Sequence, residues 1–579
     1  MAPKRKKPGR KKKTVASSET SRQFLNKRER LLRRFYEPLV LLHTLGDVGG
    51  SRTNPASSSS SPSPTDNSNN SDIRGFRRGF LDELAYVCDY DTGADTVTAI
   101  GLESASHGCV FWVASNTPPA AKLIPFLKIL LQTLRRAAIA SVPYEKDAED
   151  IAKLCITFGA RRIKRYRSLL SRELEGCAEY FETNKESLQD LEQWLRRFCT
   201  PDPNDLVSIC QFAFETGNSQ EKQLLYQLSQ EPSYRTNKDA IHHKFSKLHH
   251  YISRLAQHIH AANTLVSTAP NLTHLLDSYS IRAIPTPSRA EWLPPIDEAA
   301  VRNKTLLDKV LVRMLPAKSP ELGFYQQELR RMDETTQLSY RFLRPYTDPT
   351  IRPRVHAEIQ VLEHFYSKGL CFEGSDRYIA CSKPACYCCR LYFRHHPGNF
   401  EEPVSGGKIY LNWRPPDVSV ITEFGGVDAN ANPAQGDNDK QNQTLQRDIL
   451  NAMIRDIRKD ALREIIGKQD LSTYAGSAST AAERWPSTGV ERKWNGVTGG
   501  ERDGLAIDAF PFPPAKGPSS TIASQPQFNK RHDSCSTATA PFSAGSMDSS
   551  LASVPGSFNS DEDVEEEDFD DDGGVPLYG

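Results

Sequence analysis

The sequence predicts an α/β fold that carries a large all-helical insertion. Residues 96–103 alternate between apolar and polar side chains, and residues 109–114 form a continuous apolar run, so both are expected to be β-strands. A third strand-like run, residues 377–381, lies between two segments whose apolar residues recur at helical spacing. Between the two groups of strands, residues 122–346 show one helical pattern after another.

The 579 residues contain 38% hydrophobic side chains, enough for two or three packed domains. The net charge of +1 hides a strong asymmetry, because residues 1–13 are densely basic and residues 561–572 are almost entirely acidic. The basic run resembles a nuclear import signal and could also bind phosphate backbones. We therefore expect a nuclear protein, with the cytoplasm as the alternative.

Twelve cysteines occur without a hydrophobic signal segment at the N-terminus, which favours free thiols in a reducing compartment. No run of about 18 apolar residues exists, so no membrane-spanning segment and no membrane partner are expected.

Composition divides the chain into seven parts. Segments poor in apolar residues cannot offset the entropy of ordering, so we expect them to be disordered. The expected parts are a basic disordered head (1–20), a helix (21–48), a Ser/Pro-rich linker (49–72), a β-hairpin (73–120), the helical insertion (121–345), a motif region (346–468) and a disordered acidic tail (469–579). Helices of the insertion are expected at residues 123–139, 147–158, 160–181, 185–198, 203–216, 220–228, 237–265, 299–315 and 325–342.

The motif region contains residues suited to a metal site. His356 opens a helical pattern that Gly369 is expected to end. Cys386 and Cys389 are three positions apart, so at the start of a helix they share one face. One imidazole and two thiolates can hold a zinc ion and leave a fourth coordination position open. Glu358, two residues after the histidine, is placed to move the protons of a water molecule bound there.

Other interpretations of these residues stay open. Cys381 and Cys388 are alternative thiolates, although Cys388 points to a different side of the helix from Cys386 and Cys381 lies on the preceding strand. A structural zinc site, or unrelated cysteines in a core, would use the same residue types.

The order H-x-E followed by C-x-x-C resembles the cytidine deaminase-like superfamily of zinc deaminases, most closely its fungal branch of predicted nucleic-acid or nucleotide deaminases. The proline that usually precedes the first cysteine directly is here separated from it by Ala385. The resemblance implies an α-β-α core in which helices flank a mixed sheet. It also implies Zn²⁺ as cofactor, with His356, Cys386 and Cys389 as ligands and Glu358 as the catalytic acid and base.

The implied activity is hydrolytic deamination of a nucleobase, in a nucleotide or a single-stranded nucleic acid. Zinc-bound hydroxide attacks the ring carbon, Glu358 shuttles the protons and ammonia is released. Two alternatives differ in class: a nuclear interaction protein with a structural zinc site, and a nucleic-acid-binding protein without turnover. The sequence indicates neither the base nor the oligomeric state.

Deaminases of this superfamily place a β-hairpin directly before the H-x-E helix, and no strand pair lies just upstream of His356. We therefore expect the hairpin of residues 96–114 to pair with residues 377–381 across the insertion. Asn116 follows the second strand, where related deaminases contact the sugar of the substrate. The alternative is that Asn116 only starts a turn before Pro118 and Pro119.

Several further patterns carry weaker expectations. Residues 408–413 are expected to form a strand, and residues 444–466 a helix that covers one face of the sheet. Six histidines on one predicted helix could bind a metal but more often form a polar face: His242, His243, His249, His250, His258 and His260. Arginines and lysines of residues 161–172 could contact nucleic acid or form a solvated face. Aromatic side chains near the motifs could stack on a base or belong to the core: Tyr387, Tyr410 and Trp413.

Overall fold

The computed structural model describes the chain between residues 27 and 476, with gaps at residues 49–67, 120, 140–143, 200–201, 203–204, 231–237, 295, 317 and 418–432. All described residues belong to one compact unit. The predictions for the basic head, most of the acidic tail and most of the Ser/Pro-rich linker lie outside the described residues. Where the structure does describe these segments, residues 68–72 and 469–476 are helical rather than irregular. None of the described helices is long and apolar enough to cross a membrane.

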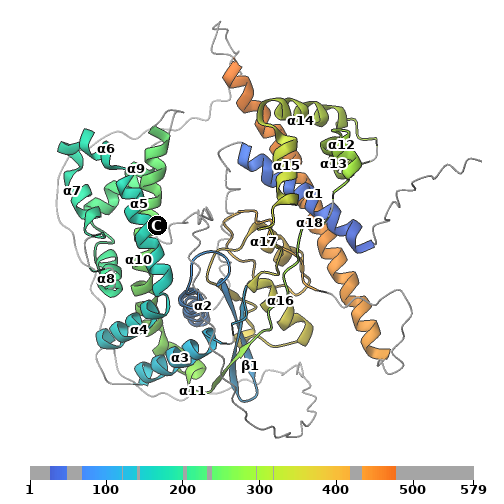
Figure 1. Cartoon of the computed structure of the whole chain (residues 1–579). Helices are drawn as coiled ribbons and strands as arrows, with labels where there is room; N and C mark the ends of the chain where they lie inside the picture. The colour runs from blue at the N-terminus through green and yellow to red at the C-terminus, as the bar shows by residue number, and fades with distance from the viewer. Residues whose placement is uncertain are drawn as a thin grey trace, which may run out of the picture. The chain divides into compact units, whose positions relative to one another are not determined.

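A mixed four-stranded sheet lies at the centre of the described chain (Figure 1). Its strands, in the order β3-β2-β1-β4, are β1 (Thr98–Ala105), β2 (Gly108–Ser115), β3 (Tyr279–Ala283) and β4 (Ile379–Cys381). β1 is antiparallel to both β2 and β4, whereas β2 and β3 are parallel. The predicted α/β class is confirmed.

The hairpin expected from residues 96–114 forms and pairs with β4, as predicted. Ala99 faces Cys381 and Gly101 faces Ile379, across more than 270 residues of intervening sequence. A side chain at position 101 would collide with the helix on that face, because its Cβ would lie 2.6 Å from Phe365 Cε2 and 2.7 Å from Val361 Cγ1. Glycine therefore lets this helix approach the sheet closely.

The insertion is helical but also supplies β3, which the sequence analysis does not predict. Its helices are α3 (Leu123–Ile139), α4 (Tyr144–Phe158), α5 (Ala160–Glu175), α6 (Ala178–Thr183), α7 (Lys185–Arg196), α8 (Leu206–Glu215), α9 (Gln220–Gln230), α10 (Lys238–Thr268), α11 (Thr273–Asp277), α12 (Glu298–Arg302), α13 (Leu306–Met314), α14 (Leu322–Thr336) and α15 (Leu338–Thr347), with a 3₁₀ turn at Ala269–Leu272. β3 is short and its side chains are half-buried or exposed, so it lacks the apolar run that marks the first hairpin.

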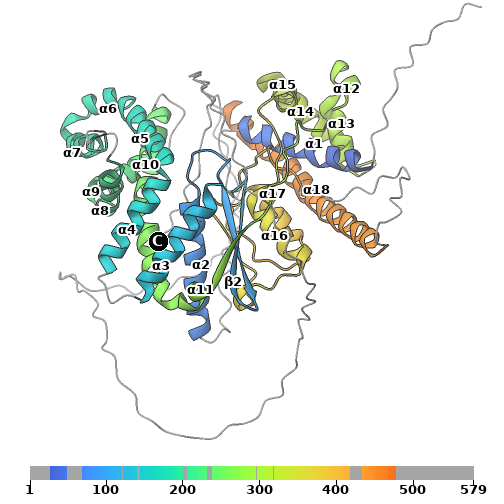
Figure 2. The ribbon, with the colours of Figure 1, turned by 60° about the horizontal axis from the view of Figure 1, so that its bottom comes forward.

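The sheet separates two hydrophobic cores. Side chains alternate between its faces along a strand, so Phe111 and Val113 of β2 enter one core while Trp112 and Ala114 enter the other. The first core contains α2 (Ser68–Cys88), α3 and α10, and the second contains α16 (Ala357–Lys368) and α17 (Tyr387–His395). Figure 2 shows α2 and α16 on opposite sides of β2.

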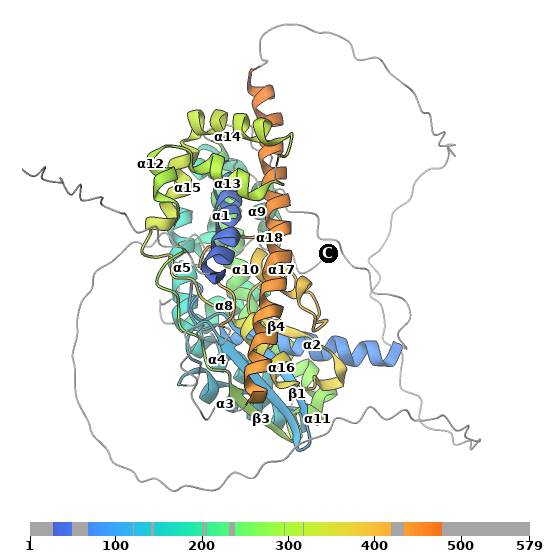
Figure 3. The same ribbon diagram turned by 90° about the vertical axis from the view of Figure 1, so that its right-hand side faces the viewer.

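Two long helices, one near each end of the described chain, complete the second core. α18 (Pro433–Gly476) packs mainly against α1 (Lys27–Val48), α17 and α14, as Figure 3 shows for α1. The prediction that this C-terminal helix covers a sheet face is wrong, because α16 takes that position against β1, β2 and β4. Amphipathicity predicted a buried stripe but could not identify its partner.

The predicted strand at residues 408–413 does not form. This segment makes single backbone contacts instead, such as Tyr387 N to Lys408 O at 2.8 Å and Arg354 N to Asn412 O at 2.6 Å. Gly407 just before it has φ +68°, a left-handed conformation that interrupts an extended ladder. The segment is a loop that ties together the starts of α16 and α17.

Candidate metal centre

His356 occupies the residue before the first turn of α16, with extended backbone angles of φ −70° and ψ 152°. Its backbone carbonyl accepts hydrogen bonds from the amides of Ile359 and Gln360, both at 3.1 Å. The helix ends at Gly369, which has φ +60°. The start and the end of this helix agree with the sequence prediction.

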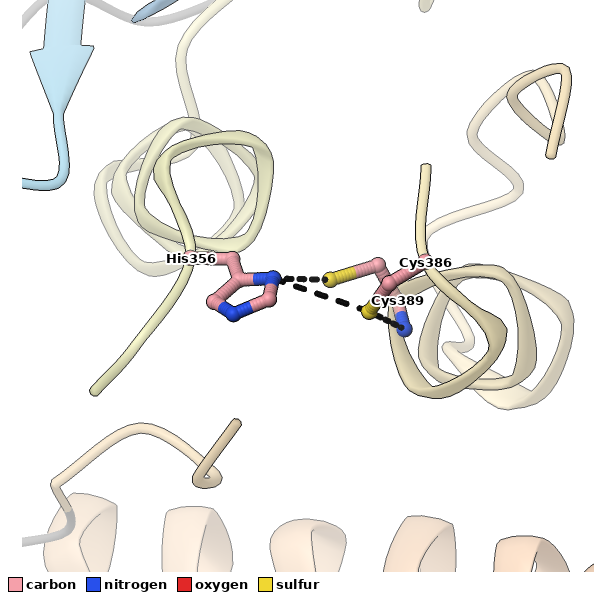
Figure 4. A group of neighbouring side chains, drawn as sticks. All are labelled: His356, Cys386 and Cys389. Atoms are coloured by element: carbon pink, nitrogen blue, oxygen red, sulfur yellow. Dashed lines mark hydrogen bonds between the residues drawn. The ribbon is translucent and has the colours of Figure 1, made fainter. Parts of the chain in front are cut away.

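Cys386 holds the equivalent position at the start of α17. Its Sγ accepts a hydrogen bond from the backbone amide of Cys389 at 3.3 Å, which fixes the two cysteines on the same turn. Because both helices direct their N-terminal ends at this point, their dipoles favour negative charge on the sulfurs. Figure 4 shows the imidazole of His356 facing both sulfurs across the gap between the two helices.

The three donor atoms lie at distances that suit a zinc ion. His356 Nδ1 is 3.6 Å from Cys386 Sγ and 3.4 Å from Cys389 Sγ, and all three donor atoms are within 4.8 Å of one another. A tetrahedral zinc with bonds of about 2.1 Å to nitrogen and 2.3 Å to sulfur separates these atoms by about 3.6 Å. The residues present therefore fit the cofactor that the sequence predicts.

The two cysteines of the cluster differ in the direction of their pKa shifts. Burial acts to raise the pKa of Cys386, but hydrogen bonding from Cys389 and the neighbouring His356 outweigh it, so this pKa lies well below its ordinary value. Burial and the charge on Cys386 in turn raise the pKa of Cys389. Cys389 by itself therefore favours the neutral thiol, and a bound divalent metal would stabilise its thiolate.

Glu358 lies beside the cluster without belonging to it. Its side chain is only 4% exposed, and its Oε2 is 4.0 Å from the sulfur of Cys381. Burial raises the pKa of this carboxyl above its ordinary value, partly offset by His356. Cys381 therefore neighbours the glutamate rather than the three donors, and Cys388, although fully buried, is also outside the group.

Asn116 is also brought to the start of α16. Its Oδ1 accepts a hydrogen bond from the backbone amide of Ala357 at 2.9 Å, and its Nδ2 donates one to the carbonyl of Ala94 at 2.7 Å. The side chain thus satisfies one of the free amides at the head of the helix that follows His356. Each end of the amide retains capacity for one more hydrogen bond, so substrate contact stays a prediction.

Sequence reasoning missed the polar contacts that hold the segment before α16. Gln360 is buried and its Nε2 donates to the carbonyls of Val355 at 2.8 Å and Ser115 at 3.3 Å. Arg354 forms a close ion pair with Asp95. The contact of Gln360 could have been predicted from the sequence, because Gln360 lies four residues after His356, on the same face of the helix. The ion pair of Arg354 could not, because Asp95 lies too far away in sequence.

The three aromatic candidates have different environments. Trp413 is fully buried against Phe35, with ring centroids 5.3 Å apart, and Tyr387 is buried with its hydroxyl on Asp460 at 2.8 Å. Tyr410 is 44% exposed, and its ring centroid is 6.5 Å from that of His356. Of the three, only Tyr410 is available to a substrate beside the cluster.

The other polar patterns have structural partners. His258 is buried in α10 with its Nδ1 3.3 Å from the carbonyl of Arg254. Arg162 is buried and pairs with Asp89, and Arg167 donates to the carbonyls of Cys199 and Asp202, both at 3.2 Å. Across the described part of the chain, the three residues of the motif form the one His/Cys/Asp/Glu group able to hold a metal.

One comparison with known proteins finds a match within the motif region. A family model described as OTT_1508-like deaminase (OTT_1508_deam) matches residues 355–417. This match supports a deaminase family. It covers His356, Glu358, Cys386 and Cys389 and begins one residue before the histidine. No curated protein and no solved structure matches the chain significantly.

Proposed function

We propose that this chain is a zinc-dependent hydrolytic deaminase of the cytidine deaminase-like kind, acting on a nucleobase in a nucleotide or nucleic acid. The observation that carries the proposal is the convergence of one imidazole and two thiols at zinc-binding distances, next to a buried carboxylate that is not a ligand. A structural zinc site has no need for such a carboxylate. The deaminase family match over the same residues supports the assignment.

In this proposal His356, Cys386 and Cys389 hold the zinc, which when bound lowers the pKa of a water molecule towards neutrality, to about 7. Glu358 accepts a proton from that water and delivers protons to the ring nitrogen and then to the exocyclic amine. The balanced reaction consumes one water, replaces the amine of the base with oxygen and releases one ammonia. Burial of Glu358 keeps bulk water away from the proton it carries.

Different parts of the chain position the proposed ligands and contact the substrate. The backbone amide of Cys389 and the start of α17 stabilise charge on Cys386, and the extended segment before α16 orients the His356 ring. Asn116 fixes the head of α16 and, with its remaining hydrogen-bonding capacity, is our candidate for contact with the substrate sugar. Tyr410 is the aromatic residue positioned to border the bound base.

The decisive experiment combines zinc analysis of the purified chain with a screen for ammonia release from nucleosides, nucleotides and single-stranded oligomers. We expect about one zinc per chain and ammonia release from at least one substrate. Glu358→Gln should lower the rate by about 100- to 10,000-fold, the usual contribution of a general acid and base, while zinc stays bound.

Glu363→Gln is the matched control, because Glu363 lies on the same helix but accepts its hydrogen bond from Tyr392 at 2.6 Å. It should retain both zinc and activity. Full activity in Glu358→Gln would remove the proposed role of the carboxylate. Bound zinc without ammonia release from any substrate would indicate a structural metal site instead.

A further inference from the structure

A hollow adjoins the segment that carries His356. It has a volume of about 260 Å³ and is lined by residues from four parts of the chain, among them Arg28, Tyr36, Arg289, Trp292, Pro353 and Arg414. Pro353 precedes His356 by three residues, and three extended residues span at most about 11 Å. The wall of this hollow is therefore within roughly one or two nucleotide lengths of the metal cluster.

The hollow is built by the same contacts that position the metal ligands. The backbone amide of Ala290 donates to the carbonyl of Pro353 at 2.7 Å, and the amide of Arg414 donates to the carbonyl of Arg354 at 2.8 Å. α1 closes one side, since the hydroxyl of Tyr36 donates to the carbonyl of Trp413 at 2.8 Å. A ligand held here is consequently in a fixed position relative to His356.

The wall combines an aromatic face with positive charge. Trp292 is 65% exposed, so most of its indole has no protein neighbour to cover it. Arg28 makes no hydrogen bond or ion pair within the described chain, and Arg289 and Arg414 reach Asp95 and Asp417 at 2.8 and 2.7 Å. The wall itself contains one acidic residue, Asp417, against three arginines.

We infer that this hollow binds the nucleotide next to the target base of a single-stranded nucleic acid, with its base stacked on Trp292 and its phosphate on Arg28. An exposed aromatic ring beside cationic side chains is the combination that holds unpaired bases and their backbone. A duplex keeps its bases stacked on one another and so offers none to Trp292. The inference rests on the proposed function and narrows its substrate to single strands.

The test measures binding without turnover, in full-length Glu358→Gln protein, by fluorescence anisotropy of a labelled single-stranded oligonucleotide. Trp292→Ala should weaken binding about 5- to 150-fold, the usual effect of removing one stacking partner. Trp292→Phe should recover most of the affinity. Tyr340→Ala, which removes a similarly exposed ring on α15 (68%), should have no effect.

Arg28→Ala should reduce the slope of log affinity against log salt by about 0.7, as expected for one phosphate contact on a single strand. The matched control is Arg341→Ala, because Arg341 is an exposed arginine of α15 outside the hollow. It should leave the slope unchanged.

Two results would overturn the inference. One is an affinity for single strands that Trp292→Ala does not change, and the other is an equal loss of affinity for duplex and single strand. Failure of the proposed function is recognised separately, by the absence of ammonia release in the wild-type chain. In an active enzyme, Trp292→Ala should lower kcat/KM for oligomers but not for free nucleosides.

Discussion

In the core around α10, Arg162 is buried but donates to Tyr166 at 3.0 Å and to the carbonyl of Asp89 at 2.9 Å. In the core around α16 and α17, by contrast, His356, Cys386 and Cys389 face mainly one another. The first arrangement is complete without a ligand, whereas the second brings together three donor atoms that together could hold a metal ion. This difference separates polar groups that stabilise the fold from those poised to bind a cation.

The histidines illustrate the same contrast. Six of them on α10 are a more conspicuous metal signal in the sequence than the single His356, yet they do not converge with other ligands. His242 lies 2.7 Å from the carbonyl of Leu228, and His260 lies 3.3 Å from Glu83. The number of histidines along one helix is thus a weaker indication of a metal site than the meeting of His and Cys side chains from separate helices.

The largest effect should follow from removing a proposed ligand. Cys389→Ser should lower zinc affinity by more than the roughly 10- to 100-fold typical of an outer-shell change, because it removes a first-shell donor. Metal analysis and competition with a chelator measure this affinity. Cys388→Ser is the matched control, since Cys388 is equally buried but outside the cluster. Equal zinc loss in both variants would show that the ligand set is misassigned.

Removing Arg162 from its buried hydrogen-bond network should lower stability without affecting metal binding. Arg162→Ala leaves Asp89 buried without its cation, and such a change costs about 3–5 kcal/mol of unfolding free energy. Urea denaturation measures the loss. Zinc content of the folded fraction should stay at the wild-type value. A stable variant that loses zinc would contradict the separation between the two cores.

A smaller effect is expected on the pH dependence of stability, through His258. Burial lowers the pKa of His258 from 6.5 to about 3, so between these pH values the unfolded chain binds more protons than the folded one. Stability is therefore fully present above pH 6.5 and falls as the pH is lowered, by about 2 kcal/mol between pH 7 and pH 5 from this residue.

His258→Gln should remove this part of the pH dependence, whatever it does to stability at pH 7. The measurement compares urea midpoints at the two pH values for the variant and the wild type. His274→Gln, which alters an exposed imidazole on α11, should keep the wild-type difference. An unchanged difference in His258→Gln would show that His258 is not buried in its neutral form.

The sequence by itself determined the local elements and the candidate site. Strand alternation located the hairpin, apolar periodicity located most helices of the insertion, and the spacing of His356, Glu358, Cys386 and Cys389 indicated the metal chemistry. These features depend on neighbours within a few residues, so they can be read along the chain.

Only the tertiary structure decided which distant segments meet. It added β3 to the sheet, gave α16 rather than α18 the position against it, and turned residues 408–413 into a loop. It also joined Arg28, Trp292 and Arg414 around one hollow. The physical reason is that packing is stabilised by contacts between surfaces hundreds of residues apart in sequence. A local sequence pattern does not indicate which distant surface becomes the partner.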